Sequence, residues 1–281
     1  MRAAAVQLNS KDDVAANMAS ADRLTRVAAA GGADLVVLPE KMNLVGTPEQ
    51  YRAGAEPLDG PTVEWARATA SELGIDLVAG SFTEAREGHE LPANTCVHAG
   101  PDGELRGVYR KIHMFDVAIP GREFQESAAQ EAGDEIVTSA AEGAELGLSV
   151  CYDLRFPELY RIQAVRGARV LVVPSAFTAY TGAAHWDTLL RARAIENQAF
   201  VVAADQVGFS PTGSESYGGS QIVDPWGDVL ARAGDAAAGD GEPCVVAADL
   251  DLARQEAIRA ELPSLANRMP ATYEWPQEVR A

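Results

Sequence analysis

Three residues with reactive side chains each follow an apolar run that has the composition of a buried strand. Glu40 comes after LVVLP, Lys111 comes after VYR, and Cys151 comes after LGLSV. Because open α/β sheets bind ligands beyond the carboxyl ends of their strands, we expect these side chains to meet at one edge. An ionised thiol attacks a carbonyl carbon, an ammonium stabilises the resulting oxyanion, and a carboxylate carries the proton to a leaving amine. The pattern therefore predicts nucleophilic chemistry at a carbonyl group.

Each of these residues also has a structural alternative. A single cysteine after a strand is most often a packed core residue, and a glutamate or lysine there is most often a solvated loop charge. Cys96 in NTCVHA and Cys244 in CVVAADL occupy expected strands, so we interpret both as small buried hydrophobic residues. Three cysteines without a C-x-x-C pair indicate reduced thiols rather than a disulfide framework.

Apolar runs bounded by Gly, Pro or Asp alternate with helical patterns along the whole chain. The runs predict strands over residues 3–8, 35–38, 76–80, 94–99, 104–110, 145–150, 169–173, 200–204, 219–223, 229–231 and 244–249. Apolar residues at helical spacing predict helices over 14–28, 63–73, 157–166 and 184–198. Continuous apolar strands interleaved with helices indicate a layered α/β architecture with buried sheets. The loop over 208–218 (GFSPTGSESYG) is of the kind that borders a site.

The composition is strongly acidic, with 41 Asp and Glu against 23 Lys and Arg and a net charge of −18. Such a field repels nucleic acid and anionic membranes, so we expect neither as a partner. One interpretation is a halophilic protein, because about 1 M salt shortens the Debye length to about 3 Å and so screens the acidic surface. The other is an acidic protein with no adaptation to salt.

The first nine residues do not form a signal peptide, so we expect a cytoplasmic protein. No linker or repeat divides the 281 residues, so we expect a single domain.

The segments around the three reactive residues carry a family resemblance. LVVLPEKMNLVG, YRKIHMFDVAIPG and LSVCYDLRFPELYR, in this order, resemble the nitrilase, or carbon-nitrogen hydrolase, superfamily. The resemblance runs from Ala4 to the TYEW segment near the C-terminus. It implies a four-layer α-β-β-α sandwich, with the hydrolase domain over residues 1–270 and a tail over 271–281. It also implies a homodimer or a higher homo-oligomer.

The resemblance implies a role for each matching residue. Cys151 is the expected nucleophile, Glu40 the general base and Lys111 the oxyanion-stabilising cation. A supporting second glutamate matches Glu126 in REFQES, although Glu123 lies only three residues away. The backbone N–H of Tyr152 is the expected second oxyanion donor. The implied reaction passes through a thioester on the cysteine and needs no metal and no organic cofactor.

Further segments indicate a branch of this superfamily. CYDLRFPE resembles the branch that holds both the omega-amidases and the deaminated glutathione amidases. PSAFTAYTGAAHW is most similar to the deaminated glutathione amidases, whereas IHMFD and FQES are equally similar to the omega-amidases. Both branches imply hydrolysis of the terminal amide of a small carboxylated substrate, such as deaminated glutathione or alpha-ketoglutaramate. Phe177, Thr181 and His185 are expected near the substrate, with a structural histidine beside Trp186 as the alternative for His185.

Other functions stay open at this stage. The same scaffold could hydrolyse an N-carbamoyl amine or a nitrile. A thiol hydrolase of Cys–His type could use His113 or His185 instead of Glu40. A catalytically silent member would bind an amide without cleaving it. Arg191 and Arg193 could hold a substrate carboxylate, but arginines on helices more often form internal ion pairs.

Overall fold

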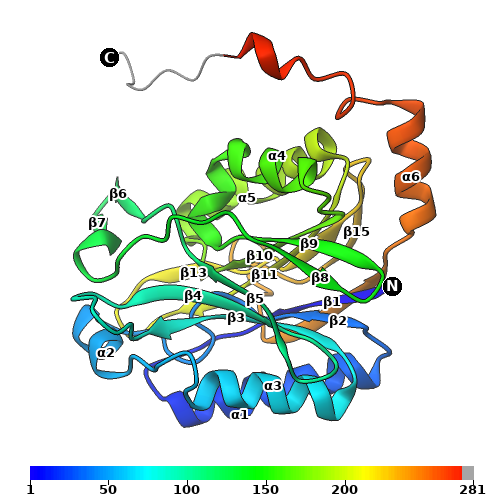
Figure 1. Ribbon diagram of the computed structural model, residues 1–281. Helices are drawn as coiled ribbons and strands as arrows, with labels where there is room; N and C mark the ends of the chain where they lie inside the picture. Colours follow the sequence, from blue (N-terminus) through cyan, green and yellow to red (C-terminus); the bar gives the residue numbers. More distant parts are fainter. Residues whose placement is uncertain (274–281) are drawn as a thin grey trace.

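The computed structural model describes residues 1–273 and has four layers, with two sheets packed face to face between two pairs of helices (Figure 1). The arrangement confirms the predicted α-β-β-α sandwich in a single domain. Residues 274–281, which make up most of the expected tail over 271–281, lie outside the described residues. Within the described part, no helix is long and apolar enough to cross a membrane.

The first sheet has the strand order β16-β1-β2-β3-β4-β5. Its strands are β1 (Arg2–Gln7), β2 (Leu35–Val37), β3 (Asp76–Glu84), β4 (Ala93–Ala99), β5 (Leu105–Arg110) and β16 (Cys244–Asp249). β1, β2 and β3 run parallel, with Ala3 opposite Leu35 and Leu35 opposite Asp76. The remaining strands pair antiparallel to their neighbours.

The second sheet repeats this plan in the order β15-β14-β11-β10-β9-β8. Its strands are β8 (Thr138–Ala141), β9 (Ala144–Leu148), β10 (Val170–Ser175), β11 (Phe200–Asp205), β14 (Gln221–Val223) and β15 (Val229–Arg232). β9, β10 and β11 are the parallel strands. A parallel bridge between Leu8 and Gln206 joins the carboxyl ends of β1 and β11, so the two sheets meet where their parallel strands end.

Helices cover the outer face of each sheet. α1 (Val14–Ala30) and α3 (Pro61–Leu73) pack on the first sheet, and α4 (Pro157–Val165) and α5 (Ala179–Asn197) pack on the second (Figure 1). Asp13 caps α1 by accepting from the Ala16 N–H at 3.0 Å, and the helix ends at Gly31. These capping residues set the bounds of α1, which contains the predicted helix over 14–28.

Several short elements lie outside the predicted pattern. They are α2 (Pro48–Ala53), β6 (Asp116–Ile119), β7 (Arg122–Gln125), β8 (Thr138–Ala141), β12 (Val207–Phe209), β13 (Glu215–Tyr217), α6 (Leu252–Glu261) and the 3-10 turns η1 (Glu126–Ala128), η2 (Cys151–Arg155) and η3 (Pro270–Thr272). β6 pairs with β7 and β12 pairs with β13 as small separate hairpins. The strands of these hairpins are short and half-exposed, so their sequences lack the long apolar runs that predict the central strands.

Apolar side chains fill the space between the two sheets. Val37, Val78 and Tyr109 from the first sheet share one buried cluster with Leu148 and Val172 from the second. The sheets approach closely at Gly107 on β5, because a methyl group added there would lie 2.9 Å from Leu148 Cδ1.

Truncating Leu148 therefore tests the layer between the sheets. Leu148→Ala leaves a cavity in this fully buried layer and should lower the free energy of unfolding by about 2–5 kcal/mol, measured by denaturant titration. Leu230→Ala, at a side chain 42% exposed, is the matched control and should change it by less than about 0.5 kcal/mol. Equal losses in the two variants would contradict this packing.

Candidate active site

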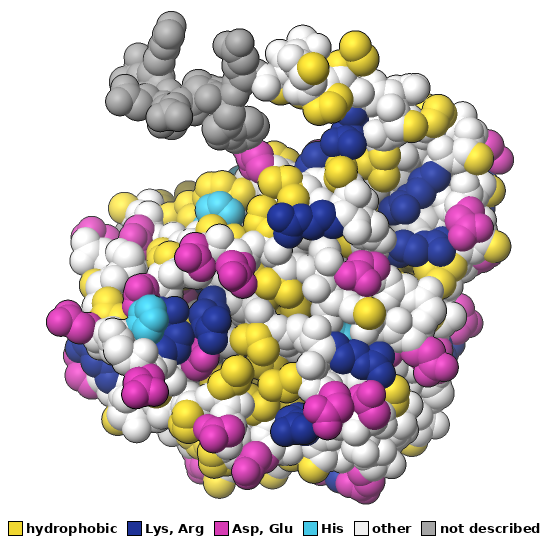
Figure 2. Space-filling model, viewed as in Figure 1, with side chains coloured by type: hydrophobic (Ala, Val, Ile, Leu, Met, Phe, Trp, Pro, Cys, Tyr) yellow, Lys and Arg dark blue, Asp and Glu magenta, His cyan; other side chains and the backbone are white. Residues whose placement is uncertain are grey.

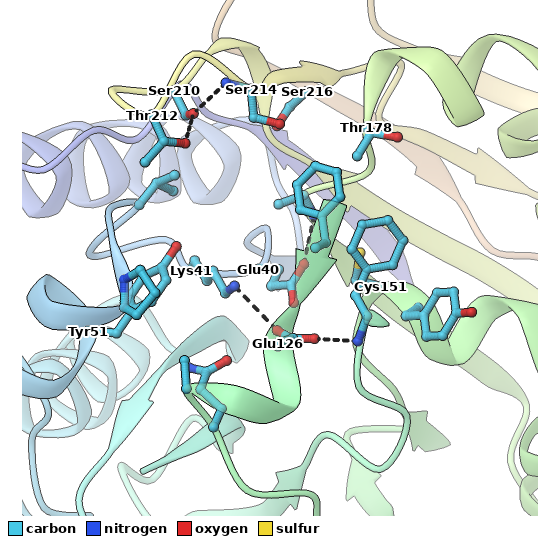
Figure 3. A pocket seen from close by; sticks show the side chains of 18 of the residues that line it. Glu40, Lys41, Tyr51, Glu126, Cys151, Thr178, Ser210, Thr212, Ser214 and Ser216 are labelled. Atoms are coloured by element: carbon cyan, nitrogen blue, oxygen red, sulfur yellow. Dashed lines mark hydrogen bonds and ion pairs between the residues drawn. The ribbon is translucent and has the colours of Figure 1, made fainter. Parts of the chain in front are cut away.

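Three reactive side chains from separate strands line one cavity of about 320 Å³ (Figure 3). Glu40 follows β2, Lys111 follows β5 directly, and Cys151 follows β9 by three residues. The two sheets thus contribute to the same site, since β2 and β5 belong to the first sheet and β9 to the second.

Glu40 is fixed through both of its carboxylate oxygens. Its Oε1 accepts from Lys111 Nζ at 2.9 Å and from Asn94 Nδ2 at 2.7 Å. Its Oε2 accepts from the backbone N–H of Ala176 at 3.0 Å. Only 2% of Glu40 and of Lys111 is exposed, so their ion pair lies in a region of low dielectric where opposite charges interact strongly.

Glu126 is the second carboxylate that contacts the ammonium of Lys111. Its Oε2 accepts from Lys111 Nζ at 2.7 Å and from the Phe115 N–H at 2.9 Å, and its Oε1 lies 3.3 Å from Lys41 Nζ. Burial raises the pKa of Glu126, but Lys111 and Lys41 outweigh this and hold that pKa below its usual range. Burial likewise lowers the pKa of Lys111, but Glu126 and Glu40 raise it well above its ordinary value. Glu126 and Lys111 are therefore both charged at neutral pH.

The neighbouring Glu123 does not join this network. Its side chain is exposed and accepts from Gln125 Nε2 at 3.2 Å. Of the two glutamates left open by the sequence, the structure brings Glu126 into contact with the buried lysine.

Cys151 begins the turn η2 with a φ of +50°, a conformation that costs a non-glycine residue about 1–3 kcal/mol. Asp153 holds this turn, because its Oδ2 accepts from the Val150 N–H at 2.8 Å and from the Tyr109 hydroxyl at 2.7 Å. The backbone N–H of Tyr152 donates to no acceptor among residues 1–273. The turn therefore presents a thiol and an unused backbone donor beside each other.

The thiol of Cys151 is protonated in the free site. Burial and the negative charge of Glu40 raise its pKa well above the ordinary value of 9.0, and Lys111 only partly opposes them. A neutral thiol beside a carboxylate is arranged for proton transfer during attack, because Glu40 is available as the acceptor.

The residues expected near the substrate divide into two groups. Phe177 and Thr181 line the cavity. His185 does not line it; the side chain is exposed and lies 3.3 Å from Arg155 Nη1, so the expectation of a pocket wall is wrong for this residue. On the helix α5, that position faces outward, while Trp186 beside it is fully buried.

The other residues left open by the sequence have internal roles. His113 Nδ1 lies 2.7 Å from Asp153 Oδ1, and its ring stacks on Phe156 with centroids 3.6 Å apart. Arg191 donates to the Gly227 carbonyl at 2.7 Å, and Arg193 donates to the Leu154 carbonyl at 2.7 Å and 3.0 Å. Neither the histidine nor the arginines line the cavity.

The sequence model of the carbon-nitrogen hydrolase family matches residues 2–260. The chain belongs to this family. It is 38% identical over 271 residues to the deaminated glutathione amidase of Synechocystis sp., covering 95% of this chain and 97% of that protein. It is 37% identical over 273 residues to the omega-amidase NIT2 of Homo sapiens, covering 97% of this chain and 96% of that protein.

A solved structure supports the same placement. It is a mutant of the amidase from Nesterenkonia sp. AN1 in which acrylamide has added to the active-site cysteine. The TM-score is 0.75 at 30% identity, covering 94% of this chain and 98% of that one. The carbon-nitrogen hydrolase fold is thus shared over nearly the full length of both chains.

This carbon-nitrogen hydrolase also uses site residues that the sequence pattern does not reveal. Asn94 on β4 bonds Glu40, and Lys41, which lines the cavity, contacts Glu126. Lys41 is directly adjacent to Glu40 and is one of only three lysines, which is the signal that could have found it. Within residues 1–273, no group of three or more His, Cys, Asp or Glu side chains is placed to hold a metal ion.

The raised pKa of Cys151 predicts how its alkylation depends on pH. Iodoacetamide reacts with the thiolate, so labelling of the wild-type residue should rise only above the ordinary thiol pKa of 9.0. In Glu40→Gln the opposing negative charge is gone while Lys111 remains, so the midpoint should move to lower pH. Peptide mass spectrometry in a Cys244→Ser background measures the midpoint. An unchanged or higher midpoint in Glu40→Gln would contradict this electrostatic account.

Proposed function

We propose that this carbon-nitrogen hydrolase is an amidase that cleaves the terminal amide of a small carboxylated substrate and releases ammonia. The observation that carries the proposal is the convergence of Glu40, Lys111 and Cys151 in one cavity, with Glu40 and Lys111 2.9 Å apart. The cavity volume of about 320 Å³ suits a small linear amide. Relatives named for amidase activity on deaminated glutathione and for omega-amidase activity support the substrate class.

The first step forms a thioester. Glu40 takes the proton of the Cys151 thiol as the sulfur attacks the amide carbon. Lys111 carries three donors, and two are used by Glu40 and Glu126, so the third can stabilise the oxyanion. The Tyr152 N–H supplies the second oxyanion donor. Glu40 then gives its proton to the amide nitrogen, the carbon–nitrogen bond breaks, and ammonia leaves.

The second step returns the enzyme to its starting state. With ammonia gone, Glu40 is again a carboxylate and removes a proton from water as the water oxygen attacks the thioester carbon. The same two donors stabilise the second oxyanion. The carbon–sulfur bond breaks, the acid product leaves, and the proton on Glu40 returns to Cys151. Glu126 supports both steps as a positioning residue, because it fixes the ammonium of Lys111 at 2.7 Å.

Steady-state ammonia release from a substrate panel tests this proposal. The panel holds deaminated glutathione, alpha-ketoglutaramate, a carbamoyl amine and a nitrile. The two carboxylated amides should be hydrolysed fastest. A faster carbamoyl amine or nitrile would favour those alternatives on the same scaffold, and no turnover of any member would favour an amide-binding protein.

Single substitutions test the assigned roles on the best amide substrate. Cys151→Ala, Glu40→Gln and Lys111→Met should each lower kcat at least about a thousandfold, since each removes a nucleophile, a proton carrier or an oxyanion donor. His185→Ala, outside the cavity, is the control and should keep kcat within about threefold of wild type, since surface substitutions have small effects. Loss in His185→Ala with retention in Glu40→Gln would support a Cys–His hydrolase instead.

We also propose a halophilic, cytoplasmic homodimer whose catalytic domain spans residues 1–270. Acidic side chains are spread over the visible face rather than gathered in one patch (Figure 2), and the net charge is −18. Exposed apolar residues on the outer helices, Ile162 and Val165 on α4 and Tyr180 and Ile195 on α5, support a second copy as partner. Free Cys96, Cys151 and Cys244 support a reducing compartment.

A salt series tests the halophilic dimer. Molar salt screens the self-repulsion of the acidic surface, so circular dichroism should report a folded chain in about 2 M KCl and an unfolded one in dilute buffer. Light scattering at high salt should give twice the 29.7 kDa chain mass. Full folding in dilute buffer would contradict halophily, and a monomer mass at high salt would contradict the dimer.

A further inference from the structure

Lys41 is a partly buried cation in the cavity that the proposed mechanism does not use. Its φ is +56°, in the left-handed region that a side-chain-bearing residue rarely adopts. The Ser81 hydroxyl accepts the Lys41 N–H at 2.9 Å, and the Ser81 carbonyl accepts the Met42 N–H at 3.0 Å, so β3 holds this bend. On extended backbone, consecutive side chains point to opposite sides. The bend instead lets the adjacent Glu40 and Lys41 line the same cavity.

The ammonium of Lys41 has unused hydrogen-bonding capacity. It lies 3.3 Å from Glu126 Oε1 and 4.7 Å from the centroid of the Tyr51 ring, which interacts with a cation through its face. A lysine carries three donors, and Glu126 is the one acidic partner of Lys41 among the described residues. The side chain is 16% exposed, and in Figure 3 Glu40 lies between Lys41 and Cys151. At least one donor is therefore available to a molecule in the cavity.

Lys41 also differs from the other cations of the cavity in the contacts that it already makes. Lys111 already contacts two carboxylates at 2.9 Å and 2.7 Å. Arg122, on the hairpin β6–β7, donates to the Thr212 carbonyl and hydroxyl at 3.3 Å and 3.2 Å. An anionic substrate that enters a protein of net charge −18 needs a local cation. Without the charge of Lys41, the two carboxylates of Glu40 and Glu126 would outweigh the one ammonium of Lys111 in the inner cavity.

We propose that Lys41 selects for amides whose acyl group carries a carboxylate, by binding that carboxylate while Lys111 stays at the reacting carbonyl. This inference rests on the proposed amidase function and names the residue behind its substrate class. Lys41 is thus a specificity-determining residue placed next to the general base. The alternative role, that Lys41 only holds Glu126 in position, would affect charged and neutral amides alike.

Ammonia-release kinetics with a matched substrate pair separate these roles. Succinamate carries a carboxylate, and 4-methylpentanamide has an uncharged, branched isopropyl group at the same position. Wild type should prefer succinamate at least tenfold in kcat/KM. In Lys41→Met the preference should fall about ten- to hundredfold, through a higher KM for succinamate, because a charge-assisted hydrogen bond is lost. Lys11→Met, which makes the same change in net charge outside the cavity, should keep the wild-type preference.

Three kinetic results would overturn the inference. The first is equal kcat/KM of the wild-type enzyme for the charged and the neutral amide, a result that does not depend on the folding of any variant. The second is an equal loss for both amides in Lys41→Met, which would assign the residue to positioning Glu126. The third is a loss of preference in Arg122→Gln but not in Lys41→Met.

A binding measurement keeps this test independent of turnover. Calorimetric titration with succinamate compares Cys151→Ala with the double variant Cys151→Ala/Lys41→Met. The affinity should fall about ten- to hundredfold in the double variant. Equal affinities would overturn the role of Lys41. Absence of ammonia release with all amides, together with this loss of affinity, would reject the amidase and keep the carboxylate-binding residue.

Discussion

The ammonium of Lys111 lies between two carboxylates, 2.9 Å from Glu40 and 2.7 Å from Glu126. Only 2% of the surface of Lys111 is exposed. A buried charge is tolerated only when it is paired, and removing one partner leaves an uncompensated charge that costs about 3–5 kcal/mol. The ends of β2 and β5 and the turn η1 must therefore keep their relative positions. The sandwich supplies this constraint by packing two sheets through one apolar layer.

The same low dielectric sets the state of the nucleophile. Burial and Glu40 raise the pKa of Cys151, so the thiol stays neutral until an amide carbon is in place to be attacked. The strained turn at Cys151, held by the Asp153 contacts, places the thiol and the Tyr152 N–H on adjacent residues. Charge separation is thus delayed until the oxyanion donors can stabilise it.

The central strands and four of the helices follow from the sequence, because continuous apolar runs and helical spacing are long there. α2, α6 and the hairpin β6–β7 do not, since their short segments carry little periodicity. The sequence predicts that Glu40, Lys111 and Cys151 lie close together, because each follows an apolar strand. His185 was misplaced because spacing along α5 does not reveal which face meets the cavity. Lys41 was missed because its bend depends on contacts from β3, distant in sequence.

Trapping the acyl group on Cys151 tests the central claim most directly. The enzyme is mixed with succinamate, quenched with acid within milliseconds to seconds and mapped by peptide mass spectrometry, with hydroxylamine added in a parallel sample. The account predicts a succinyl group on the Cys151 peptide, absent in Cys151→Ala, and a hydroxamate in the hydroxylamine sample. Ammonia release with neither product at any time point would contradict a thioester at Cys151.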